Sequence, residues 1–175
     1  MATTATQTTA VPWLTEPEQA AWRSFITTAK LVMAELERGM TQHDLSGTDY
    51  GVLVSLSEAP DRRLRMSELA QAMLLEKSRL SHQITRMERA GLVRRQSCPS
   101  DRRGQFAVLT DEGWETIQRV APYHVELVRA IFIDRLTPQQ LAQLTELFTP
   151  LHTSMRAQCP KEEADCSGDD LTAGD

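Results

Sequence analysis

Apolar residues recur every three or four positions along most of the chain, which is the spacing of amphipathic helices. The pattern runs through residues 22–40, returns over a shorter stretch at 48–58, and reappears at 110–132 and 141–155. Polar residues fill the positions in between, so each segment has one apolar face and one polar face. The periodicity therefore predicts a mainly α-helical fold.

Residues that start helices stand in front of several of these segments. Thr15 with Glu18, and Thr137 with Gln140, have the spacing of a capping box, in which the two side chains satisfy backbone N–H groups of the first turn. Thr110 is placed to cap the segment that follows it. Helices are therefore predicted to begin just after each of these threonines.

The middle of the chain has a different organisation. Two short helical segments, 66–73 and 76–91, are separated by only about three residues, and Gly91 is suited to cap the end of the second. Two short β-type runs follow, LVRRQSC and GQFAVLT, and Gly104 is expected to let the chain turn between them. A helix-turn-helix followed by a two-stranded ribbon is a winged helix, so the predicted fold is mainly α with a small two-stranded β wing.

The second helix of this motif, over residues 76–91, has two distinct faces. Leu80, Ile84 and Met87 recur at helical spacing and are predicted to point into the core. In helix-turn-helix proteins the second helix enters the major groove, where hydrogen-bond donors meet guanine edges and phosphates. The predicted DNA-facing residues are polar and rich in donors: Lys77, Ser78, Arg79, Ser81, His82 and Arg86.

Charge is unevenly distributed along the chain. The formal net charge is -5, but residues 61–105 hold 11 of the 19 basic and only 5 of the 24 acidic residues. That segment has a net charge of +6, and the remainder has a net charge of -11. A local basic region in an acidic protein is typical of a surface that meets a polyanion, and a charged face that is only solvated is the alternative.

The wing sequence SDRRGQFAVLT, together with MSELAQAM and MERAGLVRR, resembles the MarR (multiple antibiotic resistance regulator) family of winged-helix transcription factors. The resemblance covers residues 22–155. It implies that Arg103 enters the minor groove from the wing and that Asp101 orients it, while Arg102 is placed for a phosphate. It also implies a homodimer formed by the first helix and the last two helices of each chain.

The resemblance also suggests a domain organisation. Residues 15–156 form one domain, with dimerisation helices at about 15–44 and 110–156 and a DNA-binding lobe at about 46–109. Residues 1–14 and the acidic stretch 157–175 are expected to be disordered. Relatives place an effector cavity between the two lobes, and Trp13, Trp22 and Tyr50 are candidates to line it, although such aromatic residues are more often core or interface.

Other sites are less well supported. The chain has three cysteines that fit no disulfide framework, and Cys98 near Arg95 and Arg102 is a possible redox sensor. His43, His124 and His152 lack the close spacing of zinc ligands, so neither a metal nor a cofactor is expected. No catalytic motif is present, so an enzyme is not expected. The absence of long apolar runs and of a signal sequence indicates a cytoplasmic protein without membrane contact.

The function predicted from these observations is that of a dimeric, sequence-specific DNA-binding repressor. Its partner is double-stranded DNA with a pseudo-palindromic operator, and a small phenolic or metabolite effector is expected to modulate it. A winged-helix module that binds proteins is the alternative, as is a regulator that responds to redox state or metal.

Overall fold

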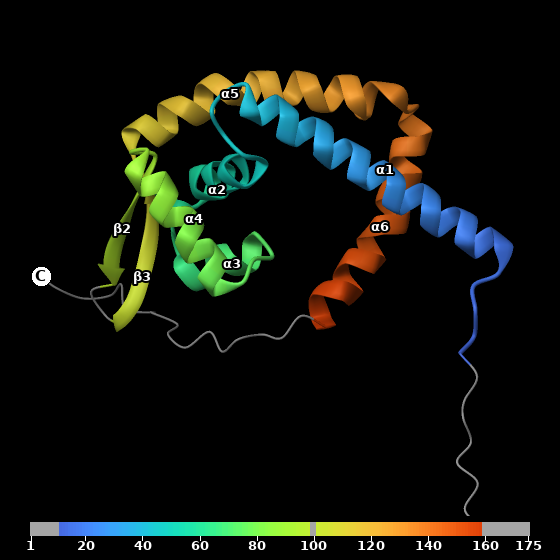
Figure 1. The fold of residues 1–175 in the computed structure, drawn as a ribbon, viewed down its shortest axis with the longest axis horizontal. Helices are drawn as coiled ribbons and strands as arrows, with labels where there is room; N and C mark the ends of the chain where they lie inside the picture. Colours follow the sequence, from blue (N-terminus) through green and yellow to red (C-terminus); the bar gives the residue numbers. More distant parts are fainter. Residues whose placement is uncertain (1–10, 99–100, 159–175) are drawn as a thin grey trace, which may run out of the picture. The chain divides into compact units, whose positions relative to one another are not determined.

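The computed structural model describes residues 11–98 and 101–158, apart from the side chains of residues 101–103. Figure 1 shows the helices and strands, which occur in the following order: α1 (Glu16–Thr41), α2 (Gly47–Glu58), β1 (Arg63–Arg65), α3 (Met66–Ala72), α4 (Lys77–Arg89), β2 (Val93–Cys98), β3 (Asp101–Leu109), α5 (Asp111–Ile131) and α6 (Pro138–Gln158). The mainly α fold with a small antiparallel sheet is confirmed.

The predicted helix starts are also confirmed. Thr15 and Glu18 form their capping box, with Glu18 Oε2 accepting from the Thr15 backbone N–H at 2.7 Å. Thr110 Oγ1 accepts from the backbone N–H of Gly113 at 3.0 Å and caps α5. Gly91 has a φ of 76°, the left-handed conformation that glycine adopts without strain at the end of a helix.

The sheet has three strands in the order β1-β3-β2, one more than the predicted ribbon. β1 is only three residues long and pairs antiparallel with β3, so Arg63 lies opposite Val108 and Arg65 opposite Phe106. The expectation that Gly104 closes the turn was wrong, because β3 already begins at Asp101 and contains this glycine. Asp101 is paired with Cys98 at the end of β2.

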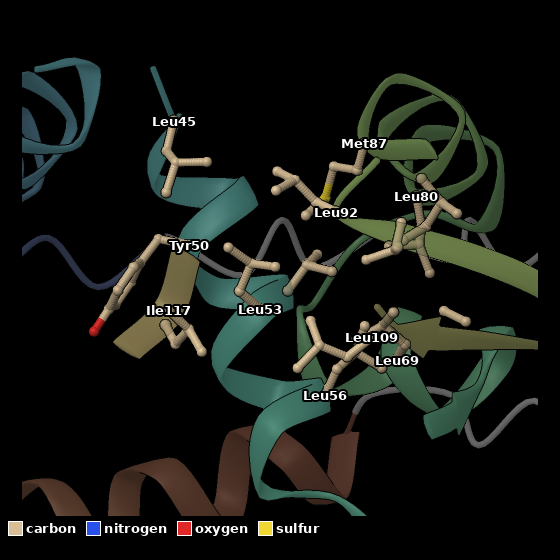
Figure 2. Packing of buried hydrophobic residues seen from close by; sticks show 14 of the residues in the cluster. Leu45, Tyr50, Leu53, Leu56, Leu69, Leu80, Met87, Leu92, Leu109 and Ile117 are labelled. Atoms are coloured by element: carbon tan, nitrogen blue, oxygen red, sulfur yellow. The ribbon is translucent and has the colours of Figure 1, made fainter. Parts of the chain in front are cut away.

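One buried cluster holds α2, α3, α4, the sheet and the first half of α5 together. Figure 2 shows Leu53 and Leu56 of α2 pointing into it beside Leu69, Leu80 and Leu109, and all but Leu109 are fully inaccessible to solvent. Burying a leucine stabilises a fold by about 1.5–3 kcal/mol, so this cluster fixes α4 against the body of the lobe.

The chain divides into two compact units at Phe132. The second unit begins with a 3-10 turn at Ile133–Arg135 and continues with α6, which starts at the predicted Thr137 cap. α6 extends to Gln158, two residues beyond the predicted end of the domain at residue 156. The expectations of disorder for residues 1–10 and 159–175 fall outside the described residues. No described helix is long and apolar enough to span a membrane.

Candidate nucleic-acid interface

Helix α4 is held in place by its apolar face. Leu80 and Ile84 are 0% exposed and Met87 is 1% exposed, which confirms the predicted inward face. Four residues separate the end of α3 from the start of α4. The carbonyl oxygen of Glu76 accepts a hydrogen bond from the Leu80 backbone N–H at 2.9 Å and closes the first turn of α4. α3 and α4 therefore form the predicted helix-turn-helix.

The opposite face of α4 is open to solvent and carries the residues predicted to meet DNA. All of the following are exposed: Lys77, Ser78, Arg79, Ser81, His82 and Arg86. Most of them lie in the first half of the helix, the part that contacts base edges when such a helix enters the major groove. Their contact with DNA stays a prediction.

The side chain of Arg86 has a partner within the protein. Its Nη2 atom lies 2.5 Å from Oδ2 of Asp49 on α2 and 3.2 Å from Oγ of Ser46, although the side chain remains 55% exposed. Asp49 is 1% exposed, and its Oδ1 accepts a second hydrogen bond from Nε2 of Gln83 on α4. Its Oδ2 also accepts from the backbone N–H and the hydroxyl of Ser46, at 2.8 and 2.7 Å.

Arg95 on β2 also forms hydrogen bonds and an ion pair with residues of α4. Its guanidinium forms an ion pair with Glu88, and its Nη2 atom donates to the carbonyl oxygen of Ser81 at 2.8 Å and to Oγ1 of Thr85 at 3.1 Å. The Arg95 backbone N–H also donates to Oε1 of Glu88 at 2.7 Å. Two separate arginine–carboxylate pairs therefore connect α4 to its neighbours.

The tip of the wing follows β2. The predicted minor-groove probe Arg103, its orienting partner Asp101 and the phosphate contact Arg102 lie at the start of β3, and their side chains fall outside the described residues. Their roles stay predictions.

The sheet carries further basic residues that the sequence reasoning did not single out. Guanidinium carbons of Arg63 and Arg65 lie 5.3 and 5.4 Å from the ring centroid of Phe106, within the range of cation–π contacts. Exposed Arg94 shares their face of the sheet, because Arg63 and Arg94 both pair with Val108. The alternation of Arg63 and Arg65 around an apolar residue was the sequence signal for this strand, but three residues are too few to predict one.

A cluster of histidine and tyrosine side chains occupies the start of α2. The rings of Tyr50 and His124 lie 4.2 Å apart between centroids, and those of His43 and Tyr123 lie 4.5 Å apart. Among the described residues, Nδ1 of His124 and Nε2 of His43 are buried without a hydrogen-bond partner. An unsatisfied buried nitrogen is unfavourable, so each of these two histidines lacks a hydrogen bond that would stabilise it.

Burial shifts the titration of this pair. Loss of solvent around His124 lowers the pKa of its imidazole below the ordinary value of 6.5. Burial, and secondarily the charge of Glu58, raises the pKa of Tyr50 above its ordinary 10.0. Both groups therefore remain neutral near pH 7.

The three aromatic residues predicted to line an effector cavity have different surroundings. Tyr50 is buried against His124, whereas Trp13 is 88% exposed and Trp22, beside Phe25, is 54% exposed. Of these three residues, Tyr50 is the one beside unsatisfied polar atoms. Its contact with a histidine 74 positions later could not be predicted from local sequence patterns.

The redox and metal alternatives stay predictions. Cys98 is buried, and Nη2 of Arg65 lies 3.4 Å from its Sγ atom. Among the side chains of residues 11–98 and 104–158, no three histidine, cysteine or acidic groups converge as metal ligands would.

Comparisons with known proteins agree with this architecture. The sequence model of the MarR family matches residues 43–104, which span the helix-turn-helix and the start of β3. The crystal structure of AbsC, a MarR family transcriptional regulator from Streptomyces coelicolor, superposes with a TM-score of 0.81 at 50% identity, over 84% of this chain and 99% of that one. The chain belongs to the MarR family.

Two further relatives extend this result. Sco3205, a MarR family regulator from the same organism whose structure was solved in complex with DNA, is 46% identical with a TM-score of 0.80, over 87% of this chain and 94% of that one. The regulator PecS of Dickeya dadantii is 33% identical over 103 residues, 58% of this chain and 61% of PecS. This MarR family member is a winged-helix, DNA-binding transcriptional regulator.

Proposed function

We propose that this MarR family protein is a homodimeric repressor that reads a pseudo-palindromic operator through α4 and the wing and is modulated by a small molecule. The observation that carries the proposal is α4 itself, whose inner face is fully buried while its outer face offers a row of exposed donors. Such donors match the acceptors of guanine edges and of phosphates.

Lys77, Ser78, Arg79, Ser81 and His82 are the proposed contacts in the major groove. Arg86 is proposed to contact a phosphate, because a guanidinium has five N–H donors and Asp49 occupies only part of them. Arg103 is proposed as the minor-groove probe, with Asp101 orienting it and Arg102 on a phosphate.

Selection of binding sites from random duplex DNA tests this function directly. We expect the protein to enrich a two-fold related sequence with half-sites about one helical turn apart. Arg79→Ala should weaken binding to that sequence by about 1–3 kcal/mol and relax the preference at one position in each half-site. Lys30→Ala, which removes an exposed charge from α1, serves as the matched control and should leave the preference unchanged.

The wing is tested with the same selected sequence. Arg103→Ala should weaken binding most where the flanks are rich in A and T, because a narrow minor groove concentrates negative potential. Asp101→Ala should also weaken binding, although removal of an acidic group near DNA would by charge alone strengthen it. Tighter binding by Asp101→Ala would contradict the orienting role.

The homodimer is supported by apolar side chains that remain exposed in each unit. Trp22, Phe25 and Leu31 of α1 are exposed, and so are Leu147, Phe148 and Leu151 of α6. Large exposed apolar patches in a soluble protein mark interaction sites. Sedimentation at micromolar concentration should give a dimer, and Phe25→Glu should shift it toward monomer; a monomeric wild type would contradict the proposal.

Tyr50, His124 and His43 are the proposed centre of the effector site, with Trp13 and Trp22 as further candidates on the α1 side. Their rings suit an aromatic ligand, and the unsatisfied nitrogens suit one with hydroxyl or carboxylate groups. Phenolic and aromatic carboxylic acids should raise the melting temperature by linkage, and His124→Phe should reduce that rise. Release of the selected operator DNA by the same compound would establish modulation.

Repression itself is tested by transcription in vitro. A promoter that carries the selected operator over its start site should give less transcript when the protein is added, and the Arg79→Ala variant should restore it. More transcript with the wild-type protein would indicate an activator.

A further inference from the structure

The apolar contacts of the recognition helix hold it against the rest of the lobe, but they restrict small rotations of the helix only weakly. Leu80, Ile84 and Met87 contribute burial, which depends on area and has little directional preference. Sequence-specific contacts require side chains to reach base edges with hydrogen-bond geometry, which tolerates only small errors in distance and angle. Directional polar contacts at the sides of α4 are therefore needed to set its orientation.

Asp49 supplies such contacts from α2. Its carboxylate accepts hydrogen bonds from Gln83 and Arg86, which lie one turn apart on α4, through different oxygen atoms. Two anchors one turn apart constrain both the rotation of a helix and its position along its axis. Gln83 is only partly exposed, and Arg86 lies in the second half of α4, beyond the proposed base contacts.

Asp49 itself is held rigidly. It occupies the third position of α2, where the backbone N–H of Asp49 donates to Ser46 Oγ at 3.1 Å while its own carboxylate caps Ser46 in return. Asp49 is 1% exposed, and both of its carboxylate oxygens accept hydrogen bonds from the protein. Water therefore does not compete for this carboxylate. The anchor is therefore fixed to the backbone of α2 and to the core beneath it.

We propose that Asp49 is a positioning residue for operator recognition: acting through Gln83 and Arg86, it sets the orientation of α4 and thereby the discrimination between operator and other DNA. Asp49 does not touch DNA in this role. The inference rests on the proposed function of α4 as the recognition helix. It goes further, because it places a determinant of specificity on α2, outside the DNA-facing residues.

The prediction separates specificity from general affinity. Phosphate contacts supply most of the binding to random DNA and tolerate small shifts, whereas base contacts do not. Loss of the anchor should therefore weaken operator binding selectively. A purely structural role would lower stability without changing the ratio of operator affinity to random-DNA affinity in the folded protein.

The decisive variant is Asp49→Asn, which keeps the size of the side chain but removes its charge and one of its two acceptor oxygens. Dissociation constants are measured for the operator selected by the wild type and for a random duplex. Both are measured at one salt concentration and at a temperature well below the melting temperature of each variant. We expect the ratio of operator affinity to random-DNA affinity to fall by about tenfold or more, the equivalent of one lost base contact, while the affinity for random DNA changes little.

Two further variants test whether Asp49 acts through Arg86 and whether the loss of discrimination is specific to these hydrogen bonds. Combining Asp49→Asn with Arg86→Gln should lower the ratio no further than Asp49→Asn alone, because residues that act as a unit are not additive. Val120→Ala is the matched control, since it loosens the same buried cluster from α5 without touching these hydrogen bonds. It should lower the melting temperature and leave the ratio unchanged.

The outcomes are distinguishable. An unchanged ratio in Asp49→Asn, or an equal fall in Val120→Ala, would overturn the positioning role. If Asp49→Asn does not fold, Gln83→Ala decides, since it removes one anchor from α4 and leaves Asp49 bound to Ser46 and Arg86; an unchanged ratio there also overturns it. A wild-type protein that enriches no sequence at all would instead refute the proposed function.

Discussion

Asp49 and Tyr50 are neighbours on the first turn of α2, yet their side chains enter polar clusters of opposite character. The Asp49 cluster is complete, because both carboxylate oxygens accept hydrogen bonds from donors on α2 and α4. The Tyr50 cluster is incomplete, since the buried nitrogen of His124 beside it has no partner among the described residues.

This difference assigns different properties to the two clusters. A buried network with all its hydrogen bonds formed is held in one geometry. A buried group that lacks a hydrogen bond is instead stabilised by any ligand or rearrangement that supplies the missing bond. The helix α2 thus carries the proposed anchor of α4 directly beside the proposed effector site. Four predictions test the contrast, in order of decreasing effect.

Removal of the complete cluster should have the largest effect on stability. Asp49→Ala leaves Gln83 and Ser46 without their acceptor and removes half of the α2 capping box. We expect the free energy of unfolding in urea to fall by about 2–3 kcal/mol, from the lost cap and the unpaired groups. Glu18→Ala, at the exposed capping box of α1, is the control and should lower it by less than about 1 kcal/mol. An equal loss of unfolding free energy in Asp49→Ala and Glu18→Ala would contradict the larger contribution of the buried cap.

The second arginine–carboxylate pair of α4 should matter less than Asp49. Arg95 and Glu88 are partly exposed, with 21% and 29% of their side chains accessible, so water replaces some of the lost contacts. Arg95→Met should lower the free energy of unfolding by about 1–2 kcal/mol. The neighbouring Arg94→Met, on an exposed side chain, should stay within about 0.5 kcal/mol of the wild type. A loss at Arg95 as large as at Asp49 would mean that the two anchors are equivalent.

The incomplete cluster should respond in the opposite direction. His124→Phe keeps an aromatic ring against Tyr50 and removes the unsatisfied nitrogen, so at pH 7.5 it should raise the free energy of unfolding by up to about 1 kcal/mol. Thermal and urea denaturation of the ligand-free protein measure the change. A destabilised variant would show that the imidazole makes a favourable contact in the folded protein.

The smallest expected effect is a dependence of stability on pH. Because burial lowers the pKa of His124 in the folded state, the unfolded chain binds more protons below pH 6.5. The contribution of neutral His124 is complete above pH 6.5 and is lost as the pH falls through the folded-state value. The melting temperature should therefore drop less between pH 7.5 and pH 5 in His124→Phe than in the wild type. Parallel curves would exclude His124 as the titrating group.

Local features of this protein were determined by the sequence alone. The caps at Thr15, Thr110 and Thr137 and the left-handed Gly91 depend on neighbouring residues, which is why their roles were predictable. The buried face of α4 was equally predictable, because helical periodicity separates apolar from polar positions wherever the helix packs.

Features that join distant segments were decided only by the tertiary structure. β1 is a strand because β3 pairs with it, and β3 extends past Gly104 to Asp101, which pairs with Cys98 of β2. Asp49 meets Gln83 and Arg86 across 34 and 37 positions, so the exposed arginine that helical periodicity assigned to DNA also anchors its own helix. Hydrogen bonding between such residues depends on how helices pack, and periodicity specifies which face is buried but not which polar groups meet at its edge.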